Sequence, residues 1–520
     1  MSFTSFLRIV YKDNRRIEQK KLAIYSEHTA DYFQFYDDSR RLQIHLRRRS
    51  DYPTAYCSVN THQGAWFGYG ARYPGENDEA LRVHVAPTGA IRIERDMYCA
   101  LPLFYGYSEG IFVVSNQYDE VCSLLPRLTL APDAVRSYLW SPFPLLQTMW
   151  QEVGILGARE TLTLEHGKLH KIAAPPRSWK YSSELMAVDP KNFADLLENR
   201  LEQFVATRMT GARVGFEVSG GMDSGLLPLY LAKLGYIVRM PAGSLVVPPP
   251  EAERQMQKLA ALEQQAPLHI FRTALNPASD HPLSILLEGH PLRPRYILHE
   301  LYEKGVQRIA THLQQQGTTL VVRGIGGDQL FEYIPRPDNY APASPLRPPP
   351  FLKGTFRGEN VIFDHAGKDI LAFSHPLEQL ASANIYIEHD IWPVSPFHDQ
   401  VLYNFCQSLS FGLRTNKNIL RAYFAANHFP AIIYQGPNES FEQFFNQSML
   451  QPLYSQLIEA CAERSVTDQL GLIDSILLRR TYADIYANSQ NPEPLMAIHN
   501  WLYTEIELQL RLLGDRSQVS

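Results

Sequence analysis

Residues 216–227 place an acid inside a glycine turn, in the order Phe-Glu-Val-Ser-Gly-Gly-Met-Asp-Ser-Gly-Leu-Leu. An extended, largely apolar segment precedes the turn, and helical apolar spacing follows it and stops at Gly235. The turn should therefore lie at a helix N-terminus, where unpaired backbone N–H groups and the helix dipole favour an anion. Gly220 and Gly221 would let the backbone approach that anion closely. The pattern predicts a cradle for phosphate, with a leaving pyrophosphate as its simplest occupant.

Two other functional interpretations of this turn each require a residue that the chain lacks. A P-loop needs a Lys just before its final Ser or Thr, and none stands at that position here. A nucleophile elbow needs a Gly where Glu217 stands. An ordinary tight turn between a strand and a helix remains an alternative that this motif alone does not exclude.

A second segment, residues 318–331, repeats the design further along the chain. A β-branched strand runs into a glycine turn that carries Asp328. A dinucleotide-binding fingerprint would need a Gly where Gln329 stands. Turns that follow parallel strands emerge at the carboxyl edge of the sheet, where ligands bind. We therefore expect Asp223 and Asp328 to share a Mg²⁺ that bridges nucleotide phosphates, because Mg²⁺ combines one or two carboxylates with phosphate oxygens and water.

The helices and strands that must position these turns can be predicted from the hydrophobic pattern and from the turn residues and prolines that interrupt it. Residues 1–170 alternate short β-rich runs with turn clusters, as expected of a layered sandwich. Pro175 and Pro176 indicate a linker, and a helical pattern over residues 192–207 leads into the strand before the first turn. From about residue 377 onward the pattern is predominantly helical. A chain of 520 residues is expected to hold more than one domain.

The two turns resemble motifs of the asparagine-synthetase superfamily of ATP-pyrophosphatases, whose synthetase domains carry S-G-G-x-D-S and a later G-x-G-[SG]-D. Residues 392–402 are similar to the family's P-F-L-D segment and the helix after it, and residues 416–421 are similar to its T-K-x-x-L-R helix. All four motifs occur in the family's order within residues 213–440. The resemblance implies that residues 190–520 form an α/β synthetase domain with an adenine-nucleotide α-hydrolase-like parallel sheet and a helical C-terminal part.

The resemblance also implies a set of site residues, with ATP and Mg²⁺ as cofactors. The implied ATP- and pyrophosphate-binding residues are Val218, Ser219, Gly220, Gly221, Asp223, Ser224, Met240, Gly324, Gly326 and Gly327. Met240 is included because a nucleotide base is expected just past it, against backbone at the end of a strand. The implied metal ligands are Asp223 and Asp328, and the catalytic candidates are Lys417, Arg421 and Asp399.

One charged group of the family is missing from its expected place. After the K-x-x-L-R helix, asparagine and β-lactam synthetases carry a Lys on a mobile loop that stabilises developing charge. The corresponding residues 434–440 contain no Lys or Arg. Electrostatic stabilisation of this kind is a large part of catalysis, so another donor must supply it. Arg323 joins Lys417 and Arg421 as a candidate, although each of these charges has an equally simple structural or solvated role.

The first part of the chain, residues 1–175, resembles the family's other domain, a class II glutaminase-like β-sandwich. The resemblance rests on residues 93–96, 101–105 and 111–116, which follow the progression R-D, P-L-Y-Y and F-A-S-E. Glutaminase activity in that family uses an N-terminal Cys, whereas Met1 is followed here by Ser2. We therefore expect an inactive glutaminase-like domain and an amine that does not come from glutamine.

Within the superfamily, the pattern is most similar to lasso-peptide macrolactam synthetases. These enzymes adenylate an Asp or Glu side chain of a ribosomally made peptide and let the N-terminal amine attack, releasing AMP and pyrophosphate. Gly327 stands where asparagine synthetases often have Ser, and Trp392 replaces the Glu that they tend to carry seven residues before the equivalent of Asp399. The implied partners are a precursor peptide and a leader peptidase. The alternatives are a β-lactam-type or ammonia-dependent asparagine-type synthetase acting on a small molecule, or a catalytically silent nucleotide-binding scaffold.

Composition excludes several other classes. A net charge of −5 and 20% charged residues give no strong electrostatic bias toward nucleic acid. The sequence contains no run of about 20 apolar residues and no signal peptide, so we expect a cytoplasmic protein without a membrane span. Five scattered cysteines without a C-x-x-C pair predict neither a disulfide framework nor a zinc site.

Overall fold

The structure is a computed structural model of the whole chain. It describes residues 7–12, 24–28, 32–37, 42–48, 54–60, 64–70, 79–95, 101–140, 148–157, 160–173, 190–283, 301–331, 349–353, 382–398, 402, 405, 406, 409, 413, 415–435, 439–488 and 494–516.

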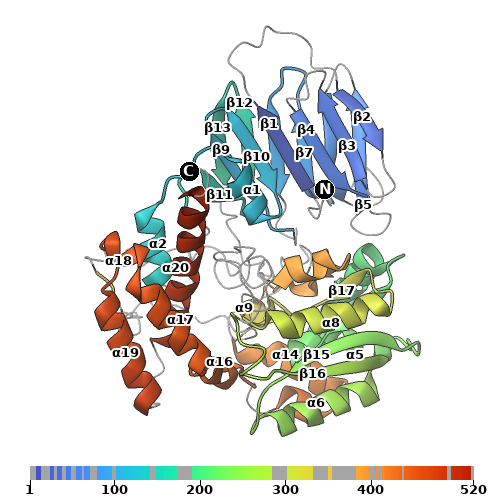
Figure 1. Cartoon of the computed structure of the whole chain (residues 1–520). Coiled ribbons are helices and arrows are strands. Elements are labelled where there is room, and N and C mark those ends of the chain that lie inside the picture. Colours follow the sequence, from blue (N-terminus) through green and yellow to red (C-terminus); the bar gives the residue numbers. More distant parts are fainter. Residues whose placement is uncertain are drawn as a thin grey trace.

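Two antiparallel sheets form the N-terminal part of the described chain (Figure 1). One has the strand order β11-β9-β10-β1-β4-β3-β2 and the other β13-β12-β8-β7-β6-β5. The strands are β1 (Leu7–Lys12), β2 (Ile24–His28), β3 (Tyr32–Asp37), β4 (Leu42–Arg47), β5 (Thr54–Asn60), β6 (Gly64–Gly70), β7 (Glu79–Val85), β8 (Ile91–Arg95), β9 (Phe104–Ser108), β10 (Ile111–Ser115), β11 (Val153–Ile155), β12 (Glu160–Glu165) and β13 (Lys168–Ala173).

The two sheets bury their apolar faces against each other. Strand β4 alternates buried and half-buried side chains, as a strand with one face in a core should. The rings of Phe35 on β3 and Phe67 on β6 lie with centroids 4.2 Å apart and so join the sheets directly. Both rings belong to one buried cluster with Ile44 and Val83. The expected layered sandwich is therefore present, and its kinship to glutaminases stays a prediction.

A parallel sheet forms the second layered region, in the order β16-β15-β14-β17-β18. Its strands are β14 (Val214–Glu217), β15 (Met240–Val246), β16 (Leu268–Ala274), β17 (Leu320–Val322) and β18 (Trp392–Val394). Strand β14 pairs in parallel with β15 on one side and with β17 on the other. The chain therefore reverses its direction of winding at β14, and ligands of open parallel sheets bind at such a point.

Helices cover both faces of the parallel sheet (Figure 1). Strand β14 is followed by α5 (Met222–Lys233), and β15 is followed by α6 (Ala252–Gln265). Helices α5, α6, α4 (Pro190–Phe204) and α14 (Asn418–Ala426) share one buried cluster with the sheet, whereas α8 (Glu303–Gln315) packs in a separate cluster with Val321 of β17. The π-helix η1 (Val205–Met209) extends α4, and α9 (Gly327–Phe331), η3 (Pro396–His398), η4 (Thr415–Lys417) and α15 (Ala431–Tyr434) are short.

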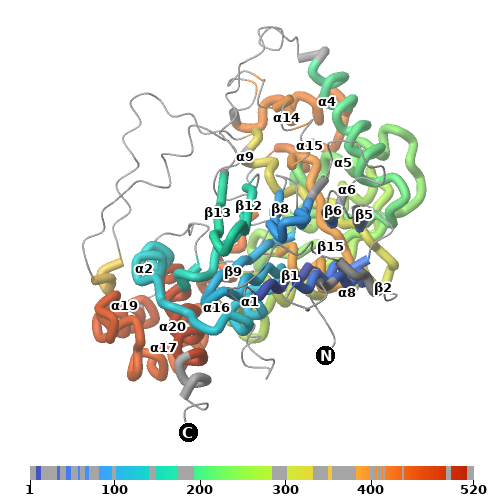
Figure 2. Tube along the Cα trace, turned by 90° about the horizontal axis from the view of Figure 1, so that it is seen from above, coloured from blue at the N-terminus to red at the C-terminus, as the bar shows by residue number. Residues whose placement is uncertain are grey.

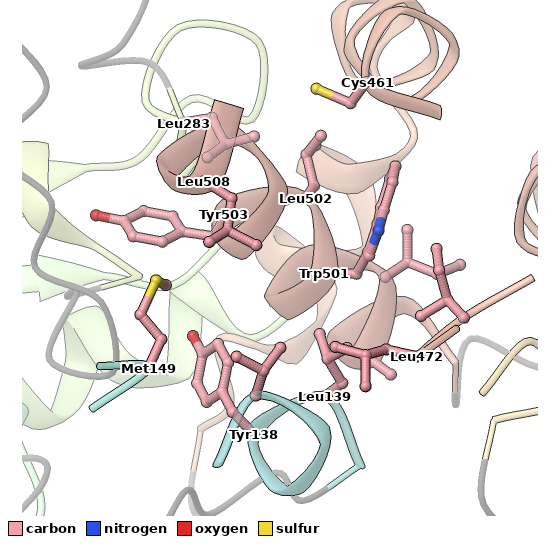
Figure 3. Packing of buried hydrophobic residues seen from close by; sticks show 14 of the residues in the cluster. Tyr138, Leu139, Met149, Leu283, Cys461, Leu472, Trp501, Leu502, Tyr503 and Leu508 are labelled. Atoms are coloured by element: carbon pink, nitrogen blue, oxygen red, sulfur yellow. The ribbon is translucent and has the colours of Figure 1, made fainter. Parts of the chain in front are cut away.

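The C-terminal part is helical, as expected. It comprises α16 (Glu442–Met449), α17 (Pro452–Glu463), α18 (Val466–Gln469), α19 (Ser475–Asn488) and α20 (Leu495–Arg516). These helices pack against α1 (Tyr118–Leu124) and α2 (Pro132–Trp140) from the N-terminal part. Helix α2 lies beside α20 in both views (Figures 1 and 2). Tyr138 and Leu139 of α2 face Trp501 and Leu502 of α20 in that core (Figure 3).

The hydrophobic core thus crosses the predicted boundary between residues 1–175 and 190–520. The division into these two domains stays a prediction, and most of the proline-rich linker lies outside the described residues.

The sandwich also contacts the edge of the parallel sheet. Tyr69 of β6 packs on Trp392 of β18 with ring centroids 5.7 Å apart, and Arg47 lies 2.5 Å from the carboxylate of Asp390. Trp392 is 1% exposed. Trp392 is therefore part of the packing between the two layered regions. In the part of the chain that the structure describes, no helix is both long and apolar enough to cross a membrane.

Candidate active site

The first glycine turn lies between β14 and α5. Gly220 has a φ of +88°, in the left-handed region that favours glycine. The backbone N–H of Ser219 donates to Ser224 Oγ at 3.0 Å, and the two serine Oγ atoms lie 3.1 Å apart. Val218 donates its N–H to the carbonyl of Gly243 on β15. The turn is thus closed by its own serines and anchored to the neighbouring strand.

The second glycine turn follows β17 and touches the first. A Cβ on Gly324 would lie 2.6 Å from the backbone nitrogen of Ser224, and a Cβ on Gly327 would overlap the carboxylate carbon of Asp223. No side chain fits at either position. Gly326 adds a φ of +96°. Strand β14 pairs with β17 so that Phe216 lies opposite Val322, and this register brings both turns to the same edge.

The structure brings Asp223 and Asp328 together at Lys417. The Lys417 Nζ lies 2.6 Å from Asp223 Oδ2 and also forms an ion pair with Asp328. The Lys417 side chain is 4% exposed, whereas that of Asp328 is 58% exposed. Burial lowers the pKa of Lys417, but attraction to the two carboxylates outweighs it, so the pKa is raised above its ordinary value. Lys417 is therefore a cation held by both turns.

The backbone that delivers Lys417 is unusual. Asn416 and Lys417 have φ values of +53° and +54°, although neither is glycine. Two consecutive residues in this region cost on the order of 1–3 kcal/mol each and persist only where surrounding contacts impose them. Arg421 supplies such contacts, because its Nε donates to the carbonyl of Asn416 at 3.1 Å and its Nη1 donates to the carbonyl of Tyr434. Arg421 thus braces the segment that carries Lys417.

Arg323 is held in a network at the same edge of the sheet. Its Nε and Nη2 donate to the two carboxylate oxygens of Glu217 at 2.7 and 3.2 Å. Tyr386 donates its hydroxyl to the same carboxylate, and Ser382 accepts from Arg323 Nη1. Arg323 is 7% exposed. The geometry gives this guanidinium a structural role that joins the ends of β14 and β17.

A second charge cluster touches the first turn, and sequence reasoning missed it. The carboxylate of Glu439 lies 2.8 Å from Arg254 Nε and 2.9 Å from Lys258 Nζ. Burial raises the pKa of Glu439, but hydrogen bonds from Arg254 and Lys258 outweigh it, so the pKa lies below its usual range. The available signal was the spacing of Arg254 and Lys258, which places both on one face of α6.

The roles predicted for Met240 and Asp399 stay predictions. Met240 is the first residue of β15, so it lies at the amino end of a parallel strand and not at its carboxyl end. The apolar pattern did not mark where the strand begins, and the contact of Met240 with a nucleotide base stays a prediction. Asp399 lies outside the described residues.

The described residues contain no group of three or more His, Cys, Asp or Glu side chains that could hold a metal by themselves. The carboxylates of Asp223 and Asp328 converge closely enough to share one cation, since both pair with the ammonium of Lys417. A Mg²⁺ held by the two acids would displace that ammonium and take its other ligands from phosphate and water.

No family model matches the chain, and neither does any curated protein. Among solved structures, NMN synthetase from Francisella tularensis is similar at 12% identity and a TM-score of 0.24, over 61% of this chain and 93% of that one. NAD+ synthetase from Burkholderia pseudomallei is similar at 18% identity and a TM-score of 0.19, over 47% and 93%. A glutamine phosphoribosylpyrophosphate amidotransferase from B. subtilis is similar at 10% identity and a TM-score of 0.19, over 61% and 75%. Likenesses this weak do not establish a shared activity.

Proposed function

We propose that this protein is an ATP-dependent synthetase that forms an amide bond and releases AMP and pyrophosphate. One observation carries the proposal. Two glycine turns, distant in the sequence, meet at adjacent strand ends, and their acids Asp223 and Asp328 converge on Lys417. A pair of structural turns does not need glycines packed against the other turn or acids that share one cation.

The chemistry begins with a carboxylate, which is a poor electrophile. One of its oxygens would attack the α-phosphorus of ATP, which forms an acyl adenylate and breaks the bond to the departing pyrophosphate. The first turn, from Ser219 to Ser224, would hold the departing pyrophosphate with backbone N–H groups at the start of α5. A Mg²⁺ held by Asp223 and Asp328 would neutralise phosphate charge there. The glycines keep the wall of the site free of side chains, so phosphate oxygens can reach the backbone.

Lys417 is the residue that we assign to charge stabilisation. Its ammonium remains protonated at neutral pH, because the two carboxylates outweigh the burial that would lower its pKa. It is the cation nearest both acids among the described contacts. When phosphate enters, the ammonium would exchange a carboxylate for a phosphate oxygen. Arg421 acts as a positioning residue, since it braces the Lys417 backbone. Asp399 stays a candidate on the strength of the resemblance alone.

We further propose that the substrate is a ribosomally made peptide, in which the N-terminal amine attacks the adenylated Asp or Glu side chain to close a macrolactam. Holding both groups of one molecule in the site converts a two-body encounter into a positioned intramolecular step. The features that support this branch are Gly327, whose contact with Asp223 leaves no room for Ser, and Trp392, whose buried packing replaces the usual Glu. A precursor peptide and a leader peptidase are the partners that this function requires.

The test is an assay with ATP, Mg²⁺ and a precursor peptide that carries Asp or Glu at the ring position. The proposal predicts stoichiometric AMP and a peptide product lighter by one water. AMP formed only with small amino acids or β-amino acids, with a small-molecule product, would place the protein with asparagine-type or β-lactam-type synthetases. Tight ATP binding without pyrophosphate release under any substrate would contradict the synthetase proposal and favour a silent nucleotide-binding scaffold.

A further inference from the structure

The segment that corresponds to the lysine-bearing loop of related enzymes delivers an acid in this chain. Glu439 accepts from Arg254 Nε at 2.8 Å and from Lys258 Nζ at 3.0 Å. The next residue, Ser440, donates its N–H to the Glu251 carboxylate at 2.7 Å. The Glu439 side chain is 8% exposed and that of Lys258 is 3% exposed. The carboxylate is therefore held in a nearly closed site on α6.

This site is next to the first glycine turn. A Cβ on Gly220 would lie 2.9 Å from the Cβ of Lys258 and 3.4 Å from the nitrogen of Leu259. Gln255 of the same helix donates its Nε2 to the carbonyl of Ser219 at 3.3 Å and to that of Leu245 at 2.8 Å. The middle of α6 is thus fixed against the turn that we assign to pyrophosphate. The Lys258 side chain starts at that contact and is long enough to move its charge toward the turn.

The two cations hold Glu439 as they would hold a phosphate oxygen. Charge-assisted hydrogen bonds from Arg and Lys are made equally to carboxylate and phosphate oxygens, at about 2.7–2.9 Å. Glu439 belongs to another segment of the chain, whereas Lys258 and Arg254 belong to α6, which packs against the turn. An entering phosphate would therefore compete with Glu439 for cations that are already in position.

We propose that Lys258 and Arg254 are a second phosphate-binding pair, which replaces the missing loop Lys, and that Glu439 occupies this pair until the nucleotide binds. The inference rests on the proposed synthetase function, because it assumes that the first turn receives pyrophosphate. A purely structural ion pair is the competing account. The two accounts predict opposite effects of removing the Glu439 charge on phosphate affinity. If the pair is purely structural, loss of either charge lowers stability and does not improve phosphate binding.

The experiment measures binding of magnesium pyrophosphate and of MgATP to the full chain by titration calorimetry. Lys258→Met should weaken pyrophosphate binding about 10-fold or more, because it removes a charge-assisted hydrogen bond. Glu439→Gln should tighten the same binding about 3-fold or more, because it removes the competing anion. The gain from Glu439→Gln should disappear when Lys258→Met is also present.

The matched control is the Lys233 and Glu198 pair, which has a Nζ to Oε1 distance of 2.5 Å and lies at the far end of α5 from the turn. Lys233→Met and Glu198→Gln should leave pyrophosphate affinity unchanged. If Lys258→Met does not fold, the direction in which Glu439→Gln changes pyrophosphate affinity still distinguishes the phosphate-binding pair from a purely structural pair. Unchanged or weaker binding by Glu439→Gln, or unchanged binding by folded Lys258→Met, would overturn the inference while the wild type still binds MgATP. A wild-type protein that binds neither ligand would overturn the proposed function itself.

Discussion

Two charge clusters touch the first glycine turn, and they are opposite in sign. In one, the cation Lys417 lies between the acids Asp223 and Asp328. In the other, the acid Glu439 lies between the cations Arg254 and Lys258. Each cluster holds its central group in the place where a ligand of that charge would bind. The first would accept a metal ion and the second a phosphate oxygen.

The clusters differ in how open they are. Asp328 is 58% exposed, so a cation can reach the acid cluster from solvent. Lys258 and Glu439 are 3% and 8% exposed, so an anion can reach Lys258 only after Glu439 leaves. Both clusters therefore require an exchange, of Lys417 in one and of Glu439 in the other, and the comparison teaches that the acid cluster is the more open to its ligand. The substitutions of Lys258 and Glu439 test the cation cluster, and the following predictions compare the acid cluster with charges outside it.

The largest effect is expected from Asp223→Asn. This carboxylate contacts Gly327 and pairs with Lys417, so its loss removes a metal ligand and releases the ammonium. AMP formation should fall on the order of 1000-fold, as when a preorganised charged group is removed from a site. A pyrophosphate-release assay measures the effect, and circular dichroism should show an intact fold. Normal turnover by this variant would remove the acid cluster from the mechanism.

A smaller loss is expected from Lys417→Met, on the order of 100-fold in AMP formation. The carboxylates of Asp223 and Asp328 would then face each other without a cation. The affinity for ATP should therefore depend more steeply on Mg²⁺ concentration. Lys353→Met is the control, because Lys353 is half exposed and pairs only at the surface with Asp468 at 3.0 Å. Equal activity of the two variants would mean that Lys417 only stabilises the fold.

Arg323→Met should act on stability more than on chemistry. Removing one partner of a nearly buried pair leaves Glu217 uncompensated and should lower the free energy of unfolding by about 3 kcal/mol. Denaturant titration measures this loss, and activity per folded molecule should fall less than in Lys417→Met. Unchanged stability with lost turnover would return Arg323 to the list of residues that touch the substrate.

The smallest effect is a pH dependence far from both clusters. Burial raises the pKa of Glu507 on α20 to about 7, although Arg511 opposes the shift. The folded state therefore binds this proton more tightly than the unfolded state, and stability from it is lost as pH rises toward about 7. The free energy of unfolding of Glu507→Gln, measured relative to that of the wild type, should therefore rise by about 1–3 kcal/mol from pH 5 to pH 8. Thermal melting of both proteins at both pH values measures this change. A stability difference that is the same at pH 5 and pH 8 would contradict the prediction.

The sequence predicted what local chemistry determines and missed what tertiary packing determines. Both glycine turns were predictable, because consecutive glycines between a strand pattern and a helical pattern mark a turn. Their contact was inferred from the rule for parallel strand ends, and the Gly327 and Asp223 approach agrees with it. Met240 begins its strand, and an apolar segment does not reveal where its strand begins. The pairing of Glu439 with Lys258 joins residues 181 positions apart, and the spacing of Arg254 and Lys258 on α6 does not reveal their acidic partner.

The central claim is that the two turns form a single magnesium-dependent nucleotide site. The most direct measurement is the affinity for ATP of wild type and of Asp328→Asn, each with and without Mg²⁺. Asp328 is exposed, so its substitution should leave the fold intact. The account predicts that Mg²⁺ tightens ATP binding by the wild type and that this gain is largely lost in Asp328→Asn. An equal gain in both proteins would show that the second turn does not share the site of the first.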